Sequence, residues 1–600
     1  MRTEQAPAPS APRIEDGVED GAAAAERPGR RRRRQRTPWA EKSRTERGVV
    51  LIWFALLLVV LMGFAGFAVD LSNWWFQAER LQRAADSGAH AGVVFMPGDL
   101  TNATSTARAE VAKNGYRTSG GNANAIIAVS QEPNPNRLRV RITTTVPSYF
   151  VGLLGVDEVT LTREAVAEYV APVPMGSPEN RLGNDPEVGY NPQLWSMVGG
   201  PKSDKEWGDR YQAKVCTVGV SGCTSTTNNE YEENGYIYAV EVKSPPAGQD
   251  LRIQVYDPAF VDIGSTCGTR MPSGAQLTAL QALNPAYYGD APTRYASGAT
   301  VWCSGDVDHE GANIDTSFVV REPNATEWTD VDNPIVNNAT CSPQTFKPYD
   351  PTTTNSIYDW LRTGPESIVD GVAPWTLAES FRRWVTVCTI PAAQVKPGKY
   401  ILQVRTNATA AAPSVYAPTV NTGGHNRFSL RAGFGTSGIT SVDGTNVTIS
   451  ARGRLPLFTN ASGANATFYL ARVLPYDAGR TLRISLFDMG DVSGSAGSLQ
   501  IIPPSEYAET FSGCSFLRDG SAPSALNTTP STCTLNQVSS ANGYQGKLVT
   551  IDVPIPTDYT CDDDLPTGCW IQVRAAFPGG VNDVTTWSAA ILGNPIRLVE

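Results

Sequence analysis

Histidine is scarce in this sequence, since the 600 residues include only His90, His309 and His425. The sequence also lacks the G-x-S-x-G, H-E-x-x-H and Walker patterns of common hydrolases, zinc proteases and nucleotide-binding enzymes. A glycosidase with paired carboxylates has no local pattern and stays open as an alternative. We expect a protein that is not an enzyme.

Cysteine is absent from the first 215 residues, and all ten cysteines follow. They are Cys216, Cys223, Cys267, Cys303, Cys341, Cys388, Cys514, Cys533, Cys561 and Cys569. Paired C-x-x-C spacing, which zinc sites commonly use, does not occur. Because disulfides persist in oxidising compartments, this distribution indicates that the region after the first 215 residues is exported.

Charge is absent from residues 48–69, a run that is long enough, at about 1.5 Å per residue, to cross a hydrocarbon layer of roughly 30 Å. Ten Lys and Arg residues lie between residues 27 and 47, directly before it. Arg runs can bind nucleic acid, but a basic cluster beside an apolar run is better explained by the cytoplasmic excess of Lys and Arg that sets topology. We therefore expect a disordered cytoplasmic tail over 1–47, a retained transmembrane helix over 48–69 in contact with membrane lipid, an extracytoplasmic remainder, and no nucleic-acid partner.

The stretch after Asp70 contains no Pro up to residue 93 and spaces Leu71, Trp74, Ala78 and Leu81 at helical intervals. The membrane helix is expected to continue outward as a stalk. Trp74 and its neighbour suit either the aromatic belt of a membrane surface or packing against the next domain.

The polar register of this segment resembles the amino-terminal segment of TadE/TadG-like proteins of the Flp, or tight-adherence, pilus assembly system of bacteria. The residues that carry the resemblance are Gly48, Asp70, Trp74, Leu81, Ala84, Ala85 and Asp86. The resemblance covers about residues 46–95 and, more loosely, extends to about 170. It implies pilus biogenesis or surface adhesion, with other Tad components as partners.

One position departs from the pilin-like members of that family. Those members carry Glu five residues after the prepilin-peptidase cleavage point, whereas counting from Gly48 places Trp53 there. The chain is therefore more similar to TadG, an anchored accessory protein, than to a cleaved pseudopilin.

Beyond the stalk, residues 101–114 have a helical pattern, and 125–130, 137–146 and 158–170 alternate as strands do. With the stalk they form a small α+β module over 70–171, which the resemblance implies is pilin-like. The apolar run 149–154 is expected to fill the core of this module, with membrane contact as the alternative. The Pro-rich segment 172–185 has the composition of a linker.

The outer region contains an internal repeat, because residues 236–257 align without gaps to 467–488. Matching positions are Tyr238 and Tyr469, Ala247-Gly248 and Ala478-Gly479, Leu251-Arg252-Ile253 and Leu482-Arg483-Ile484, and Asp257 and Asp488. Alternating strands and turns predict two tandem β-sandwich domains of jelly-roll or immunoglobulin-like topology. We place the first at 186–434, enlarged by an insertion, and the second at 435–600. The fold class is therefore mainly β with an N-terminal transmembrane helix.

The repeat also suggests how the cysteines pair. Equivalent bridges would be Cys267–Cys388 and Cys514–Cys533. Cys303–Cys341 would then close the insertion, while Cys216–Cys223 and Cys561–Cys569 would close local loops. Sequence alone leaves connectivity underdetermined, so this pairing is a hypothesis.

Two acidic segments are candidate metal sites. Asp306, Asp308 and Glu310 alternate before a Gly, as in calcium loops, although Ser317 stands where an EF-hand has its closing Glu; an acidic solvated turn is the alternative. Residues 491–495 spell the D-x-S-x-S of a metal-ion-dependent adhesion site. That site belongs to a fold of alternating strands and helices, so a Gly/Ser loop after a sandwich strand is the alternative. We expect no cofactor other than a possible calcium ion.

Taken together, these features predict a membrane-anchored, extracytoplasmic structural or accessory protein of Tad pilus assembly or surface adhesion. The alternative is a surface-displayed sandwich that binds a carbohydrate or protein ligand and has no link to pili.

Overall fold

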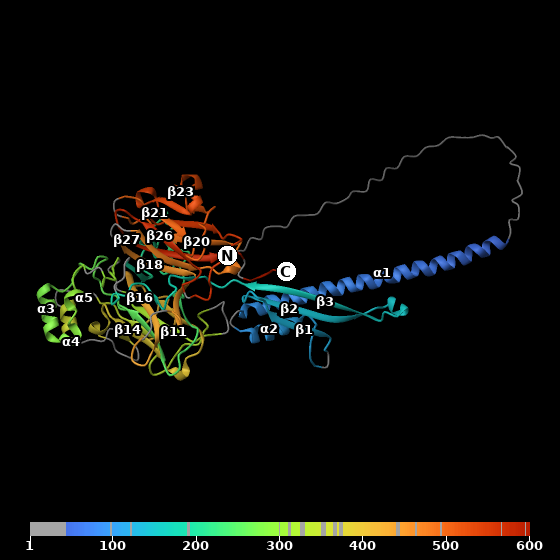
Figure 1. The fold of residues 1–600 in the computed structure, drawn as a ribbon, viewed down its shortest axis with the longest axis horizontal. Helices are drawn as coiled ribbons and strands as arrows, with labels where there is room; N and C mark the ends of the chain where they lie inside the picture. Colours follow the sequence, from blue (N-terminus) through green and yellow to red (C-terminus); the bar gives the residue numbers. More distant parts are fainter. Residues whose placement is uncertain are drawn as a thin grey trace, which may run out of the picture.

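The structure, a computed structural model, describes residues 44–599 apart from 97–98, 121–122, 189–192, 299–300, 310–313, 325–329, 350–355, 364–368, 371–375, 440–443, 462–464, 493–494, 566 and 594–595. It consists of one long helix, a small α+β module beside that helix, and a β-sandwich head (Figure 1). The tail predicted over 1–47 lies outside the described residues as far as residue 43.

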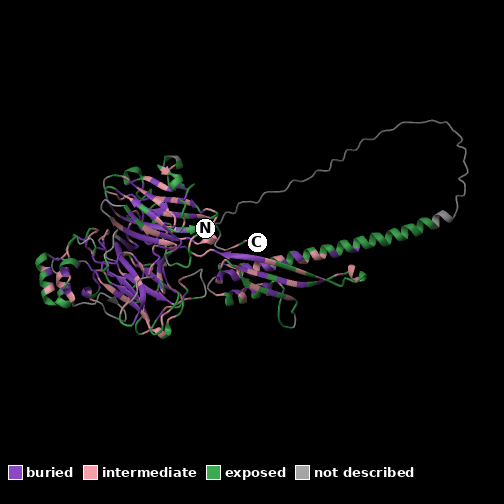
Figure 2. Ribbon diagram, viewed as in Figure 1, coloured by how far each residue is buried: buried purple, intermediate pink, exposed green. Residues whose placement is uncertain are grey.

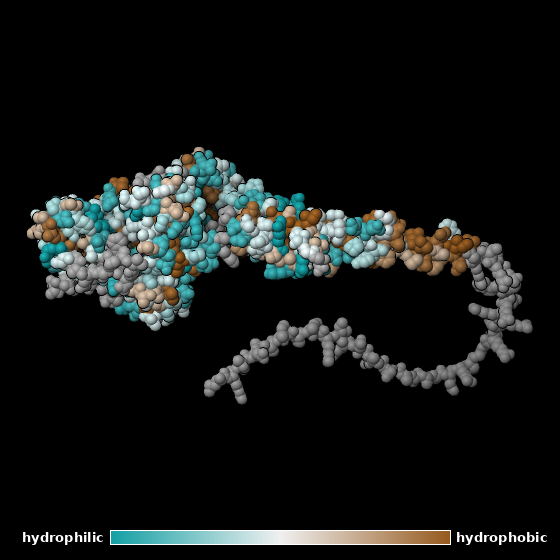
Figure 3. Space-filling view, turned by 90° about the horizontal axis from the view of Figure 1, so that it is seen from below, coloured by the Kyte–Doolittle hydropathy of each residue, from teal (hydrophilic) through white to brown (hydrophobic). Residues whose placement is uncertain are grey.

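Helix α1 (Arg44–Gly92) joins the expected membrane span and stalk without interruption. A helix of this length can continue because no Pro interrupts it. Within the described residues, one helix is long and apolar enough to cross a membrane, and it includes this span. Its first half is exposed from residue 49 to residue 65, whereas its second half is partly buried by the module (Figure 2). The exposed half forms a continuous apolar surface (Figure 3).

The module agrees with its sequence pattern. It contains helix α2 (Leu100–Lys113) and strands β1 (Ala125–Gln131), β2 (Arg137–Pro147) and β3 (Glu158–Tyr169). The antiparallel sheet has the order β1-β2-β3-β28, in which β28 (Ile596–Leu598) comes from the far end of the sequence. The module and the head are therefore joined twice by the chain.

Small side chains let α2 approach α1 closely. A Cβ at Gly88 would lie 2.5 Å from the Val111 side chain, and one at Gly92 would lie 2.7 Å from the backbone oxygen of Ala103. Ala84 and Ala85 are fully buried on the same helix. The Ala- and Gly-rich register of α1 thus places the module core against the stalk.

The head consists of two long antiparallel sheets. Each sheet contains strands from both repeats, and the inward residues of these strands are mainly apolar. The first sheet contains β14 (Trp384–Ile390), β10 (Asp250–Tyr256), β16 (His425–Gly435), β6 (Gln193–Gly199), β18 (Arg454–Ala461), β27 (Val581–Ile591), β20 (Thr481–Phe487), β25 (Leu548–Pro554) and β22 (Ser515–Arg518), in that order, with β5 (Arg181–Leu182) beside β16. The second contains β13 (Val369–Asp370), β12 (Gln344–Phe346), β11 (Thr316–Arg321), β15 (Gly398–Arg405), β9 (Tyr236–Val242), β17 (Val447–Arg452), β4 (Pro174–Met175), β19 (Asn465–Arg472), β26 (Trp570–Ala576), β21 (Gly497–Ile502), β24 (Thr534–Val538) and β23 (Thr528–Thr529).

The two repeats form the two halves of these shared sheets. In the first sheet, β6 and β18 pair at the centre, with β16, β10 and β14 on one side and β27, β20 and β25 on the other. In the second sheet, β17 and β4 pair at the centre. Each also pairs with a strand of the other repeat: β17, which follows the first repeat, pairs with β9 of that repeat, and β4, which precedes it, pairs with β19 of the second repeat. The expected linker 172–185 therefore contains strands that tie the two halves together, because its backbone groups are paired in both sheets.

The first repeat carries the expected insertion between β10 and β14. It includes the helices α3 (Gly274–Leu283), α4 (Pro285–Tyr288), α5 (Ala291–Arg294), α6 (Ile357–Thr363) and α7 (Leu377–Ser380). Helices α3, α4 and α5 lie at the end of the head farthest from α1 (Figure 1).

All ten cysteines form disulfides. Cys216–Cys223, Cys514–Cys533 and Cys561–Cys569 are present, as the sequence suggests. The pairing expected for the insertion is wrong, because Cys267 bonds Cys303 and Cys341 bonds Cys388. The reason is that Cys341, in the insertion, forms an isolated β-bridge with Cys388 and therefore lies directly beside it. The first repeat thus does not reproduce the disulfide of the second repeat.

Candidate functional site

The loop between β2 and β3 is attached to α1 at a buried carboxylate. Asp70 is fully buried and accepts hydrogen bonds from the backbone N–H groups of Tyr149, Phe150 and Val151, at 2.8, 2.8 and 2.7 Å. These amides begin the short 3₁₀ turn Val151–Leu154, whose first N–H groups have no partner within the turn. Asp70 therefore caps this turn. It holds the end of the β2–β3 hairpin, residues 149–156 and here called the hairpin tip, where the apolar span ends.

A second contact lies one turn before Asp70, inside the apolar span. A Cβ at Gly66 would lie 2.8 Å from Cγ of Phe150, so the ring occupies the space that a larger residue would fill. At Gly63, about one turn closer to the N-terminus, a Cβ would have no heavy atom within 4 Å apart from neighbouring atoms of the helix itself. The hairpin tip thus reaches about one helical turn past the end of the span.

The hairpin tip does not fill the module core, contrary to expectation. Leu153 is 86% exposed and Leu154 is 84% exposed, and Tyr149, Phe150 and Val156 are also exposed. The long β2–β3 hairpin carries these residues away from the core, alongside α1, because its strands continue beyond the part of the sheet that α2 covers (Figure 1). The tip is an apolar surface beside the apolar part of α1.

The other residues of the α1 pattern divide between this surface and the module. Leu81, Ala84 and Ala85 are fully buried in the module core, and Asp86 accepts a hydrogen bond from the Gln82 side chain at 2.8 Å. Trp74 is half-buried, whereas Trp75 is 69% exposed next to the span. Leu81, Ala84 and Ala85 thus have a structural basis in the pattern, because they fill the contact between α1 and the module.

Residues 48–98 match a family model described as putative Flp pilus-assembly TadE/G-like. The TadE/G-like segment thus comprises the apolar span, Asp70 and the part of α1 that packs into the module. Among curated proteins and among solved structures, none matches the chain.

A buried ion cluster fixes the module that follows the TadE/G-like segment to the head. Glu168 of β3 is 1% exposed; Arg480 donates to one of its oxygens, and Arg597 of β28 donates to the other at 2.9 and 3.1 Å. Burial by itself would raise the pKa of Glu168, but the hydrogen bonds from Arg480 and Arg597 outweigh burial and keep the pKa below its ordinary value. A cleft of about 690 Å³ opens beside this contact, between Tyr169 and the head.

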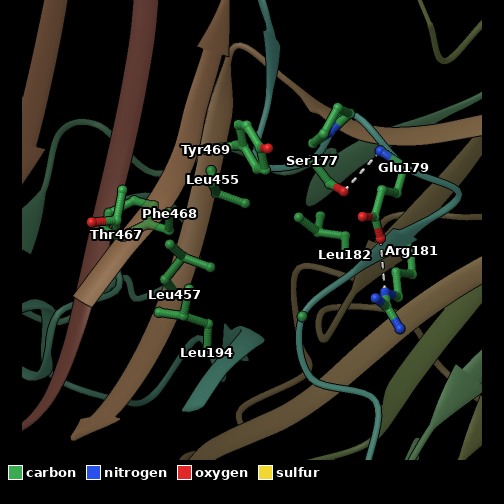
Figure 4. Close-up of a pocket in the computed structure, with 13 residues that line it drawn as sticks. Ser177, Glu179, Arg181, Leu182, Leu194, Leu455, Leu457, Thr467, Phe468 and Tyr469 are labelled. Carbon is green, nitrogen blue, oxygen red and sulfur yellow. Dashed lines mark hydrogen bonds and ion pairs between the residues drawn. The ribbon is translucent and has the colours of Figure 1, made fainter. Parts of the chain in front are cut away.

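A smaller cleft of about 120 Å³ lies where the two repeats meet. Figure 4 shows Glu179 hydrogen-bonded to Arg181, facing a wall of Leu and Phe side chains. Tyr469 of β19 adds an aromatic ring at one end of the cleft. The combination of apolar, aromatic and charged groups is typical of sites for small polar ligands.

The predicted calcium loop is only partly described. Asp306 is 1% exposed, and its two oxygens accept the backbone N–H groups of Val261 and Arg427 at 2.7 and 2.9 Å. Asp308 is half-buried, and Glu310 lies outside the described residues. Asp306 thus organises the backbone of the first repeat, and calcium binding at this loop stays a prediction.

Two histidines meet at this loop: the half-buried His309 of the loop lies edge to face with the fully buried His425. The rings of His309 and His425 lie 4.7 Å apart, and His309 stacks on Trp207 at 4.1 Å. Burial, with the nearby charge of Arg427, lowers the pKa of His309 to about 4. Burial, with His309 and Arg427, lowers the pKa of His425 well below its ordinary value.

Sequence reasoning identified Asp70 but not the buried charged residues that join the module to the head. Glu168 of β3 and Arg597 of β28 stand in strands, where their letters carry no signal. Glu168 lies on the face of β3 opposite the core residues Ala165, Ala167 and Tyr169, and only the structure shows that this second face is buried as well. The neighbours that make these residues distinctive come from other strands.

Proposed function

We propose that this chain is a membrane-anchored, extracytoplasmic structural or accessory protein of Tad (Flp) pilus assembly or surface adhesion, and that it is not an enzyme. The observation that carries the proposal is the TadE/G-like segment, in which the span and Asp70 fix a folded module at one end of an apolar helix. The N-terminus faces the cytoplasm and the head lies outside, in accord with the basic residues before the span and the five disulfides after it.

In this arrangement the hairpin tip rests on the lipid surface. Gly66 lies three residues before Val69, so Phe150 reaches about 5 Å below the end of the span. Leu153 and Leu154 would bury their side chains in the outer leaflet, at a gain of about 1.5–3 kcal/mol each. The span and the hairpin tip are then two points of membrane contact, and together they restrain the tilt of the head. A restrained tilt suits a component that must present surfaces to an assembling fibre.

The pilus components are the partners that this role requires. The module–head junction is suited to transmit position between membrane and partner, because the buried Glu168 cluster and β28 fix the two parts to each other. The observation that favours the second candidate, a ligand-binding sandwich without a link to pili, is the cleft that contains Glu179, Arg181 and Tyr469.

Deletion of the gene in the bacterium that carries it distinguishes these roles. The first proposal expects loss of Flp pili by electron microscopy and loss of surface adherence, both restored by the full chain, and co-purification of the full chain with Flp pilin or the secretion ATPase. Normal pili in the deletion strain, together with binding of the purified chain to a glycan or protein array, would favour the second role. Cysteine-labelling of intact cells, at positions introduced on the head and before the span, tests the topology.

A further inference from the structure

Three carboxylates of the second repeat meet in the interior of the head. Asp488 follows β20, Asp491 lies in the next loop, and Asp583 belongs to β27; each offers an oxygen, and these oxygens lie within 4.8 Å of one another. Asp488 is 1% exposed and Asp583 is 4% exposed, while Asp491 is half-buried. The cluster is therefore removed from water except on the side of Asp491.

Two of these oxygens are buried without a hydrogen-bond partner. Oδ1 of Asp488 accepts the Gly546 N–H at 2.6 Å, and Oδ2 of Asp583 accepts the Asp491 N–H at 3.3 Å. Oδ2 of Asp488 and Oδ1 of Asp583 accept none. Among the described residues, no Lys or Arg forms an ion pair with any of the three carboxylates. A buried carboxylate oxygen without a donor or a cation is strongly unfavourable, so this arrangement indicates a ligand that carries positive charge.

The first repeat provides an internal comparison, because it contains the same backbone site. Asp257 and Asp488 both follow the equivalent strand and share a left-handed backbone, with φ of 55° and 57°. The Asp257 carboxylate accepts the N–H of Arg382 at 2.9 Å, just as Asp488 accepts that of Gly546. Arg382 in the first repeat therefore corresponds to Gly546 in the second.

Strand register identifies a second replacement. The residue before each aspartate pairs with Ser429 in the first repeat and with Thr586 in the second. Three residues before these partners stand Asn426 and Asp583. A neutral amide in the first repeat thus corresponds to a carboxylate in the second.

In the first repeat, arginines of the chain act on two buried carboxylates. The charge of Arg382 favours the ionised form of Asp257, and that of Arg427 favours the ionised form of Asp306, although burial still raises both pKa values. Arg427 corresponds to Val584, which carries no charge.

We propose that Asp488, Asp491 and Asp583 bind one hard divalent cation, with calcium as the preferred ion, which takes the place of the arginines of the first repeat. All three ligands are oxygens, which calcium and magnesium prefer; calcium tolerates the irregular geometry of a loop and two strands better than magnesium does. The ion joins the loop after β20 to the start of β27, which already meet at the bridge between Val492 and Val581. The metal stabilises the second half of the head.

This site differs from both sequence candidates. Asp491 begins the D-x-S-x-S letters of 491–495, but its partners stand 3 residues before it and 92 after it, in antiparallel strands rather than in the fold that hosts adhesion sites of that pattern. The loop of Asp306 and Asp308 belongs to the other repeat.

The test uses the full chain in detergent, freed of metal with EDTA and dialysed at pH 7.5. Calcium chloride is titrated calorimetrically, with magnesium chloride as a parallel arm, and thermal unfolding is recorded with 1 mM calcium and with EDTA. We expect one calcium ion per chain, weaker binding of magnesium, and a rise in the melting temperature of the head by roughly 5 °C.

Asp583→Asn restores the residue of the first repeat and should weaken calcium binding at least tenfold, while the melting temperature in EDTA stays equal to or above that of the wild type. Asp491→Asn, in the half-buried loop, is a milder second variant with the same expected direction. Asp552→Asn is the matched control, because it removes a carboxylate of the same half that pairs with Arg483 on the surface, and it should bind as the wild type does. Absence of calcium and magnesium binding, wild-type binding by both cluster variants, or loss of binding in Asp308→Asn alone would each overturn the proposal.

Discussion

Replacing Asp70 by Ala tests whether one carboxylate attaches the hairpin tip to the membrane helix. The change leaves the N–H groups of Tyr149, Phe150 and Val151 without their acceptor. A hydrogen bond to a charged group contributes about 1.5–3 kcal/mol, and a buried donor left unpaired adds a desolvation penalty. Three such bonds that share one acceptor are not additive, and the freed amides regain some water, so we expect a loss of about 3–5 kcal/mol.

The effect is local, so global unfolding is a poor measure of it. Hydrogen exchange of the amides of residues 149–151 in the detergent-solubilised full chain reports the opening of the tip directly. At 1.4 kcal/mol per factor of ten, the loss corresponds to exchange that is about 100-fold to 4,000-fold faster.

The control is Ser72→Ala, which removes a hydroxyl that bonds only the Ala68 carbonyl of the same helix. It should leave exchange at the tip unchanged. Asp70→Asn keeps one acceptor oxygen but turns its amide NH2, a donor, toward a backbone N–H, and should give an intermediate rate. Exchange in Asp70→Ala within about threefold of the wild type would refute the reasoning, because a carboxylate that accepts three backbone N–H groups cannot be dispensable for their protection.

Three further predictions concern packing and pH. Gly66→Val should displace Phe150 and accelerate exchange at the tip, whereas Gly63→Val, with open space around it, should not; equal effects of the two changes would argue against the contact. Glu168 has a lowered pKa, so its contribution to stability is present above the unfolded pKa of about 4.3 and is lost as the pH falls through the lower folded pKa. Limited proteolysis of the module–head junction should therefore increase below about pH 4. The Glu168→Gln variant should show the same sensitivity to proteolysis already at pH 7. His309 and His425 have lowered pKa values, so stability should be constant above about pH 6.5 and fall as the pH is lowered toward 4; His425→Phe should flatten this slope in thermal unfolding, and a flat wild-type profile would contradict the buried neutral state.

The membrane-proximal part was the most accessible to sequence reasoning because its structure follows from local rules. An uncharged apolar run and helical spacing specify α1 whatever surrounds it, and strict alternation specifies β2 and β3. The hairpin tip was misjudged for a related reason. A short apolar run looks the same whether it fills a core or lies exposed at a hairpin end, and only the attachment of this run to Asp70 of α1 shows that it is exposed.

The repeat shows where local reasoning ends. Its letters indicated that Asp257 and Asp488 are equivalent, and the two residues do share one backbone conformation. Their surroundings differ, because Arg382 and Gly546 belong to turns far along the chain, just before β14 and β25. Disulfide pairing in the insertion failed in the same way, since a chain can return by many routes between the same two strands.

The sequence by itself determined the apolar span, the stalk that continues it, the strand content of the module and the duplication of the outer region, because each depends on residues that are near one another in the chain. Only the tertiary structure decided that the two repeats exchange strands and share both sheets, that β28 returns to the module, and that Asp488, Asp491 and Asp583 meet. Pairing between distant strands depends on the packing of all the others at once, and no local pattern of letters records it.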